Sequence, residues 1–150
     1  MIRQTELPFP LKRGLKRDKE LAPGNELPAS PHVLITGSRD WDDVETIREE
    51  LAKLPSDAII VHGGARGADL IAGSIWKSRG GKVIETKADW ERFGKAAGPI
   101  RNKQMLDEFP LAYALAFRKG LSSKGTQHMV SLLRAKGVPT LERWADGLIL

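Results

Sequence analysis

Glycine and arginine recur together in two short segments of this sequence. The first is Gly37-Ser38-Arg39, and the second is the run from His62 to Asp69, which reads HGGARGAD. At a turn between a strand and a helix, glycine lets the backbone approach a phosphate closely, and arginine offers two parallel hydrogen bonds to phosphate oxygens. The ligand contacts expected from these segments are Gly37, Ser38, Arg39, Gly63, Gly64, Arg66, Gly67 and Asp69.

Two later segments carry further basic and small residues. Residues 88–102 read ADWERFGKAAGPIRN, and residues 124–126 read KGT. From them we expect further ligand contacts by Trp90, Lys95, Arg101, Gly125 and Thr126. The four segments together contain the basic residues Arg39, Arg66, Lys95, Arg101 and Lys124. A cluster of these charges would repel itself without a bound anion, which favours a phosphorylated ligand.

Several of these residues also have a structural interpretation. The paired glycines of the second segment suit a tight turn, and Asp69 suits either a helix start or a contact with a ribose hydroxyl. Trp90 suits either a base-stacking platform or an aromatic side chain packed over a loop. We expect His62, at the end of a predicted strand, to be structural, and His128 to be a surface or packed residue of a helix.

Short apolar runs alternate with helical patterns from residue 32 onward. The predicted strands are 32–36, 58–61, 82–86, 112–117 and 138–141, and the predicted helices are 42–54, 67–77, 101–109 and 126–136. Strands that are apolar on both faces and alternate with helices are typical of a parallel sheet. The sequence therefore predicts a Rossmann-like α/β fold, a three-layer sandwich of about five parallel strands with helices on both faces. The four segments above would meet beyond the carboxyl ends of these strands.

Several other chemistries lack the residues that they need. The sequence contains no cysteine, which excludes disulfides, thiolate nucleophiles and cysteine-based zinc sites. Its three histidines lack the spacing of metal ligands, and we expect no metal. Neither a G-x-x-x-x-G-K-[ST] phosphate loop nor a G-x-S-x-G nucleophile elbow occurs. No cofactor is indicated beyond a nucleotide-derived ligand.

Composition divides the chain of 150 residues, which has a formal net charge of +5, into three parts. Residues 1–31 form a proline-rich tail or linker of mixed charge, 32–143 the ligand-binding domain, and 144–150 a C-terminal extension. Acidic residues among the basic residues of the tail make nucleic acid an unlikely partner. Without cysteine, a signal-like apolar segment or a long apolar stretch, we expect a soluble cytoplasmic protein that does not contact membranes.

A family resemblance rests on four motifs in order: GSRDW (37–41), HGGARGAD (62–69), ADWERFGKAAGPIRN (88–102) and KGT (124–126). Over about residues 32–143, the sequence resembles the YspA-like, cpYpsA-related branch of the SLOG superfamily. The resemblance implies a Rossmann-like domain that binds nucleotides or nucleotide-derived ligands, as a sensor or sequestering module in conflicts between bacteria and phages. Its LOG-type cousins commonly form dimers, so the resemblance also implies a homo-oligomer, a dimer or larger.

The LOG-type phosphoribohydrolases bear on the question of catalysis. Their loop reads P-G-G-x-G-T-x-x-E, in which the glycines hold phosphate and the glutamate is catalytic. Gly125 and Thr126 match this pattern, residues 121–123 are inserted before it, and Met129 stands at the position of the glutamate. A thioether cannot accept or donate a proton as a carboxyl group does. The resemblance therefore favours a binding module over an enzyme.

Two other functions stay open. The first is a hydrolase of nucleotides or of their N-glycosidic bonds, with Asp69, Asp89 or Glu91 as the catalytic carboxylate. The second is a nucleic-acid-binding protein that uses the basic residues of the N-terminal tail. Aromatic residues make up 6% of the chain and form no evident stacking row, which disfavours this second alternative.

Overall fold

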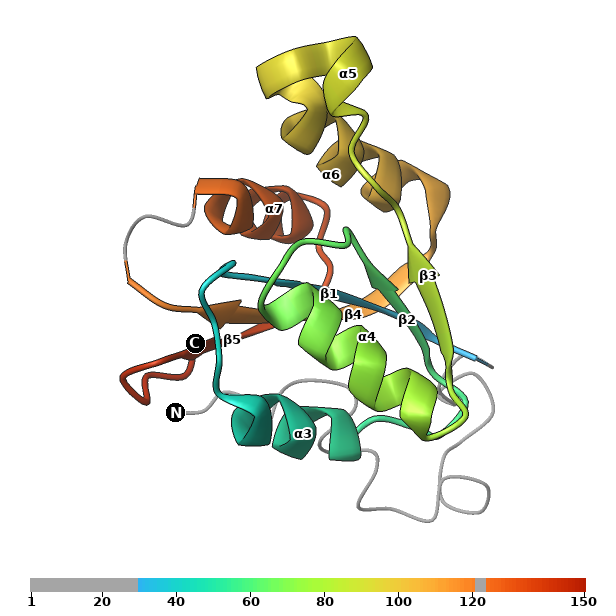
Figure 1. Cartoon of the computed structure of the whole chain (residues 1–150). Helices are drawn as coiled ribbons and strands as arrows, with labels where there is room; N and C mark the ends of the chain where they lie inside the picture. The colour runs from blue at the N-terminus through green and yellow to red at the C-terminus, as the bar shows by residue number, and fades with distance from the viewer. Residues whose placement is uncertain (1–29, 121–123) are drawn as a thin grey trace.

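The computed structural model describes residues 30–120 and 124–150. Its centre is a sheet of the strands β1 (His32–Gly37), β2 (Ile59–His62), β3 (Lys82–Glu85), β4 (Leu111–Arg118) and β5 (Thr140–Trp144), in the order β3-β2-β1-β4-β5. All neighbouring strands run parallel. Helices cover both faces, so the predicted Rossmann-like three-layer fold is confirmed (Figure 1).

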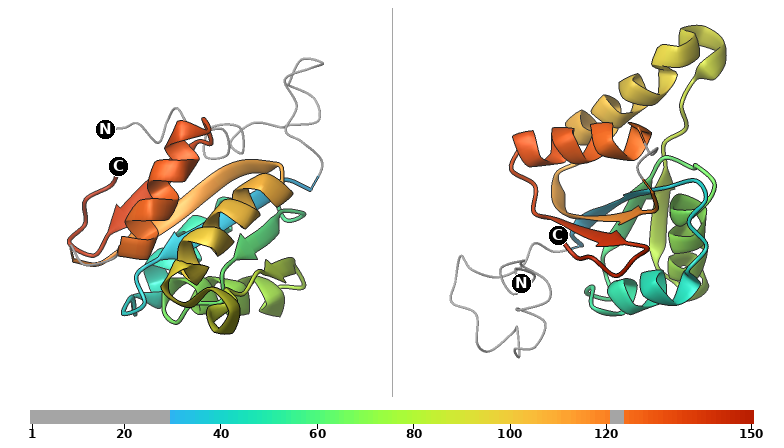
Figure 2. Two further views of the ribbon diagram at one scale, coloured as in Figure 1. Left: turned by 90° about the horizontal axis from the view of Figure 1, so that it is seen from above. Right: turned by 90° about the vertical axis from the view of Figure 1, so that its left-hand side faces the viewer.

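The alternation of side chains along β1 decides which helices cover which face of the sheet. Val33 and Ile35 pack in one core cluster with residues of α3 (Val44–Ala52) and α4 (Ala68–Ser78). Leu34 packs in a second cluster with residues of α6 (Ala97–Glu108) and α7 (Lys124–Ala135). Figure 2 shows these two pairs of helices on opposite sides of the sheet. Burial on both faces explains why β1, β2 and β4 read as largely apolar runs in the sequence.

The third connection differs most from the prediction. Residues 88–102 were expected to lead as a loop into a helix from Arg101, but they contain α5 (Trp90–Phe93), a short 3-10 helix η2 (Gly94–Ala96) and the first turn of α6. The glycines and Pro99 of this segment favour a loop in the sequence. The prediction is wrong because proline fits the first turn of a helix, where its missing N–H needs no partner.

The last strand also lies further along the chain than its predicted range of 138–141. The strand β5 continues through Glu142 and Arg143 to Trp144. Glu142 is only 5% exposed, and its two carboxylate oxygens accept hydrogen bonds from Arg118 (2.9 Å) and Arg134 (2.6 Å). Because a buried ion pair replaces apolar residues here, the apolar run ends before the strand does.

The C-terminal extension lies along the outer edge of β5. Ile149 forms an antiparallel bridge with Arg143, and the N–H of Leu150 donates to the carbonyl oxygen of Glu142 at 2.8 Å. The side chains of residues 148–150 are exposed. Backbone pairing therefore holds this segment on the edge of the sheet.

Two parts of the sequence prediction lie outside the described residues. They are nearly all of the N-terminal tail, residues 1–29, and the insertion 121–123. Across 30–120 and 124–150, no helix combines the length and the apolar character that a membrane span requires.

Candidate functional site

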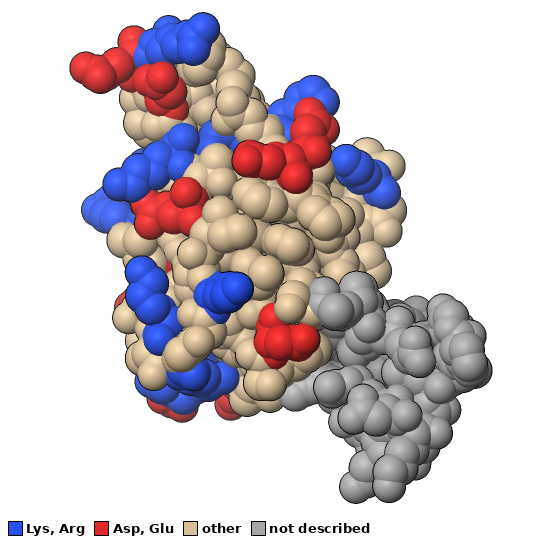
Figure 3. All heavy atoms as spheres, turned by 90° about the vertical axis from the view of Figure 1, so that its right-hand side faces the viewer, with Lys and Arg blue, Asp and Glu red and all other residues tan. Residues whose placement is uncertain are grey.

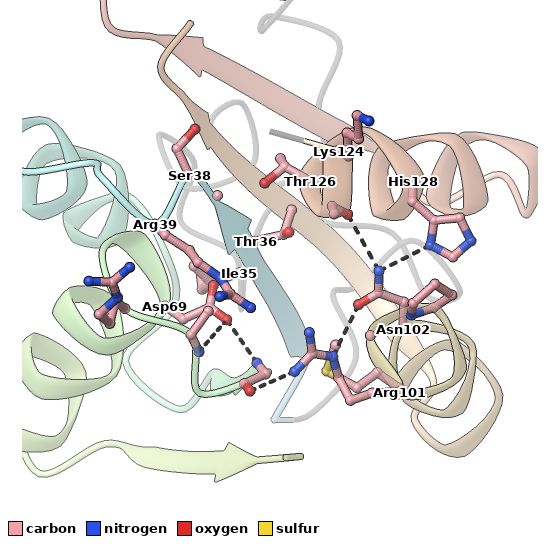
Figure 4. Close-up of a pocket in the computed structure, with 18 of the residues that line it drawn as sticks. Ile35, Thr36, Ser38, Arg39, Asp69, Arg101, Asn102, Lys124, Thr126 and His128 are labelled. Atoms are coloured by element: carbon pink, nitrogen blue, oxygen red, sulfur yellow. Dashed lines mark hydrogen bonds between the residues drawn. The ribbon is translucent and has the colours of Figure 1, made fainter. Parts of the chain in front are cut away.

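A cavity of about 810 Å³ opens at the carboxyl ends of the central strands. Ile35, Thr36 and Gly37 line it at the end of β1, and the segments after β1, β2 and β3 and the start of α7 supply its walls (Figure 4). The strand order reverses at β1, which has β2 on one side and β4 on the other. The cavity therefore occupies the place where open parallel sheets bind ligands, and its volume is typical of small-molecule sites.

Most of the predicted site residues line this cavity. They are Gly37, Ser38, Arg39, Gly63, Arg66, Asp69, Trp90, Lys95, Arg101, Gly125 and Thr126. Gly64 and Gly67 are not among the lining residues. Lining residues that the predicted set lacked include Thr36, Asp40, Pro99, Asn102 and His128.

Three backbone N–H groups of the second segment are already bound within the protein. Asp69 Oδ2 accepts hydrogen bonds from the N–H groups of Gly63 (3.1 Å) and Ala65 (3.3 Å), and His62 Nδ1 accepts one from Gly64 (2.9 Å). His62 is 2% exposed, and burial lowers its pKa, so its structural role agrees with the expectation. These three N–H groups are therefore not free to hold a phosphate.

Gly67 serves close packing between the first and second segments. Its φ is +79°, and a Cβ built there would lie 2.3 Å from the carbonyl oxygen of Ser38. A side chain would thus meet rigid backbone in a conformation that L residues rarely adopt. The presence of glycine at position 67, which suggested a phosphate contact in the sequence, is explained by the close contact between these two loops.

Asp69 has a different environment at each carboxylate oxygen. Burial raises its pKa to about 6, although the N–H groups of Ala65 and Gly63 and the charges of Arg101 and Arg39 favour the ionised form. Within the described residues, Oδ1 has no hydrogen-bond partner. Asp69 therefore lies in the first turn of α4 and organises the loop through Oδ2, while its contact with a ribose hydroxyl stays a prediction.

Arg101 joins α6 to the second segment. Its Nη1 donates to the carbonyl oxygen of Gly63 at 2.7 Å, and its Nε donates to Oδ1 of Asn102 at 3.1 Å. Partial burial lowers the pKa of the guanidinium, and nearby Asp69 opposes this effect. A Cβ at Gly63 would lie 2.4 Å from Nη1, so a glycine there makes room for this contact.

Asn102 connects the third and fourth segments, and it was missed in the sequence. Its Nδ2 donates to the carbonyl oxygen of Gly125 (3.4 Å) and lies 3.1 Å from Nδ1 of His128. Asn102 is 5% exposed and precedes the buried Met105 and Leu106 by one helical turn. A polar residue on the buried face of a helix was the signal that could have identified it.

The first turn of α7 faces the cavity with small and polar groups. Lys124, Gly125 and Thr126 all line it. Thr126 is only 4% exposed, and Figure 4 shows its hydroxyl directed toward the cavity between Thr36 and Ser38. The initial N–H groups of a helix have no partner within the helix, and a helix start is a position at which anions commonly bind.

Ser38 links the first segment to the end of β4. Its Oγ accepts a hydrogen bond from the N–H of Lys119 at 2.8 Å, and the N–H of Ser38 donates to the carbonyl oxygen of Phe117 at 2.8 Å. Ser38 is 2% exposed. These contacts place the ends of β1 and β4 side by side below the start of α7.

Positive charge dominates the lining of the cavity. Five basic residues, Arg39, Arg66, Lys95, Arg101 and Lys124, and two acidic ones, Asp40 and Asp69, line it. Among the described residues, none of these five basic side chains forms a salt bridge. On the molecular face in Figure 3, by contrast, basic and acidic side chains are interspersed. The excess of positive charge at the cavity therefore does not extend over that face as one continuous patch.

The carboxylates proposed for catalysis are not all at the cavity. Asp89 caps α5 by accepting a hydrogen bond from the N–H of Arg92 at 3.1 Å, and neither Asp89 nor Glu91 lines the cavity. Asp69 alone of the three candidates does. Met129 is fully buried in the core cluster with Leu34, so a glutamate at this position would enter apolar packing.

The sequence profile of the YspA, cpYpsA-related SLOG family matches residues 31–93, from β1 to α5. The chain is also 42% identical over 118 residues to the gene 61 protein of Mycobacterium phage D29. This match covers 73% of the chain and 93% of the phage protein. The chain belongs to the YspA, cpYpsA-related SLOG family, as its motifs predicted.

A solved structure supports the fold. DNA processing protein A (DprA) from Streptococcus pneumoniae matches with a TM-score of 0.50 and 16% sequence identity. The match covers 73% of this chain and 58% of the DprA chain, so the domain spans little more than half of that protein. At this identity the likeness concerns the Rossmann-like fold alone.

Proposed function

We propose that this domain binds a nucleotide or a nucleotide-derived phosphorylated small molecule in the cavity at the carboxyl ends of its strands. One observation carries the proposal: five basic side chains from four segments line one cavity, and no described carboxylate forms a salt bridge with any of them. Mutual repulsion of these charges disfavours the empty site, and an anion relieves it. The membership in a SLOG family and the likeness to a phage protein support a sensor or sequestering module in conflicts between bacteria and phages.

The contacts of the second segment favour the first turn of α7 as the position of the anion. The N–H groups of residues 63–65 are bound by Asp69 and His62, which leaves the start of α7 as the better source of backbone donors. There Thr126 adds a buried hydroxyl and Lys124 a positive charge. The positive end of the helix dipole favours the same position.

The side chain of Arg66 offers a direct test. Isothermal titration with ribonucleoside mono- and diphosphates and ADP-ribose, on protein freed of co-purified ligand, should show binding that Arg66→Ala weakens about ten- to a hundredfold, because a charge-assisted hydrogen bond is lost. Arg48 on α3 is exposed and does not line the cavity, so Arg48→Ala is the matched control. Equal affinity of the two variants would show that Arg66 contributes nothing to binding.

Asp69 favours a second candidate function, hydrolysis of the bound nucleotide. A buried carboxylate whose pKa is raised to about 6 is suited to moving protons near neutral pH. Incubation of the protein with the same nucleotides, followed by chromatography, separates the two functions. Retention without products supports a binding module, and turnover that Asp69→Asn abolishes supports the hydrolase.

A further inference from the structure

Trp90 differs from the other tryptophans of the chain. Trp41 and Trp76 are each 3% exposed, and their indole N–H groups donate to backbone oxygens. The ring of Trp144 lies 4.5 Å from the guanidinium carbon of Arg118. Trp90 is 50% exposed and lines the cavity, and within the described residues its indole has no hydrogen bond or stacked ring. A large apolar ring in this state is available to a ligand.

Local backbone contacts hold Trp90 in place without help from the core. Trp90 is the first residue of α5, and the carboxylate of Asp89 caps this helix through the N–H of Arg92. The neighbouring helix α6 is tied to the body of the domain by the hydrogen bond from Arg101 to Gly63. The backbone that carries the indole is therefore held at the cavity before a ligand arrives, which lowers the entropic cost of binding.

The surroundings of Trp90 leave its ring open on the cavity side. Gly98 lies against the edge of the indole, since a Cβ built there would be 3.6 Å from Cη2 of Trp90. Gly98, Pro99 and Lys95, from the same connection between β3 and α6, also line the cavity. An aromatic surface from this connection and the basic side chains of the other segments thus border one cavity of about 810 Å³.

We propose that the ligand carries a purine or pyrimidine base and that Trp90 stacks on it, while the basic cluster holds the phosphate. The inference rests on the proposed function and specifies the second half of the ligand. A sugar phosphate without a base would satisfy the cations and leave the indole in water. Stacking of a base on an aromatic side chain contributes about five- to a hundredfold in affinity and tolerates different bases, since each has a π-face.

The test compares ligands with and without a base on three proteins. Isothermal titration measures the binding of AMP, GMP, CMP and UMP, and of ribose 5-phosphate, to the wild-type chain, Trp90→Phe and Trp90→Ala. We expect Trp90→Ala to weaken nucleotide binding about five- to a hundredfold, Trp90→Phe to retain most of it, and ribose 5-phosphate to bind all three proteins alike. Circular dichroism confirms that each variant is folded.

The remaining outcomes overturn the inference in distinguishable ways. If ribose 5-phosphate binds the wild-type chain as tightly as the nucleotides do, the base contributes nothing and the anion site alone stands. If Trp90→Ala weakens nucleotides and ribose 5-phosphate equally, Trp90 shapes the site without reading a base. If none of the five compounds binds the wild-type chain, the inference fails, and the proposed function fails with it only if the nucleoside diphosphates and ADP-ribose do not bind either.

Discussion

Replacing Asp69 with asparagine should remove a specific pH dependence of folding stability. The pKa of Asp69 is raised from an ordinary 3.8 to about 6, mainly by burial. The folded state therefore holds this proton more tightly than the unfolded state, and its stability falls as pH rises from about 4 to 6. The difference between the two pKa values corresponds to about 3 kcal/mol. The asparagine side chain would keep an acceptor oxygen for the N–H groups of Gly63 and Ala65 but would not ionise.

Urea unfolding at a series of pH values from 4 to 8 measures this effect. From pH 4 to pH 8, the free energy of unfolding of wild type should fall by about 2.4 kcal/mol relative to that of Asp69→Asn, which is most of the full difference of about 3 kcal/mol. The lowered pKa of His62 affects both proteins in the same way, so it cancels in the difference. Asp107→Asn, at an exposed position of α6, is the matched control. Parallel pH profiles for wild type and Asp69→Asn would refute the account of a dehydrated carboxylate in this loop.

Two substitutions test the packing around the site. Gly67→Ala should lower the free energy of unfolding, measured in denaturant, by about 2 kcal/mol or more, because its Cβ would meet the carbonyl oxygen of Ser38. Gly80→Ala, also at positive φ but in open space, should lower it by only about 1 kcal/mol. Equal costs would contradict the close approach of the two loops. Met129→Glu should lower stability by about 4 kcal/mol or more without creating hydrolytic activity, while Met129→Leu should cost less than about 1.5 kcal/mol. A stable Met129→Glu protein that hydrolyses nucleotides would show that this side chain reaches the cavity.

The layout of the sheet follows from local signals in the sequence. The strands β1 and β4 are buried on both faces, so their residues form apolar runs that stop where the chain turns toward a helix. Because parallel strands end at one edge, the segments after Gly37 and His62 were expected to meet, and they do at the cavity. The position of the candidate site could be predicted from the order of the strands and loops in the sequence alone.

The contacts within the site depended on tertiary structure that spacing does not reveal. The sequence places Asp69 near the start of a helix, but its capture of the N–H groups of Gly63 and Ala65 depends on the direction of one side chain. Asn102 meets Gly125 only because α6 packs against α7. The glycine pattern therefore predicted most of the segments that line the cavity, whereas it did not predict the internal hydrogen bonds of the N–H groups of residues 63–65.

The central claim is that a nucleotide-type anion binds at the carboxyl ends of the strands against the start of α7. Mapping backbone amide chemical shifts while ADP-ribose is titrated into the full chain tests it most directly. We expect the largest changes at Arg39, Gly125 and Thr126 and at the indole N–H of Trp90, with smaller changes at Gly63. Absence of changes, or changes gathered at the cavity between the end of α6 and residues 136–138, which follow α7, would contradict it.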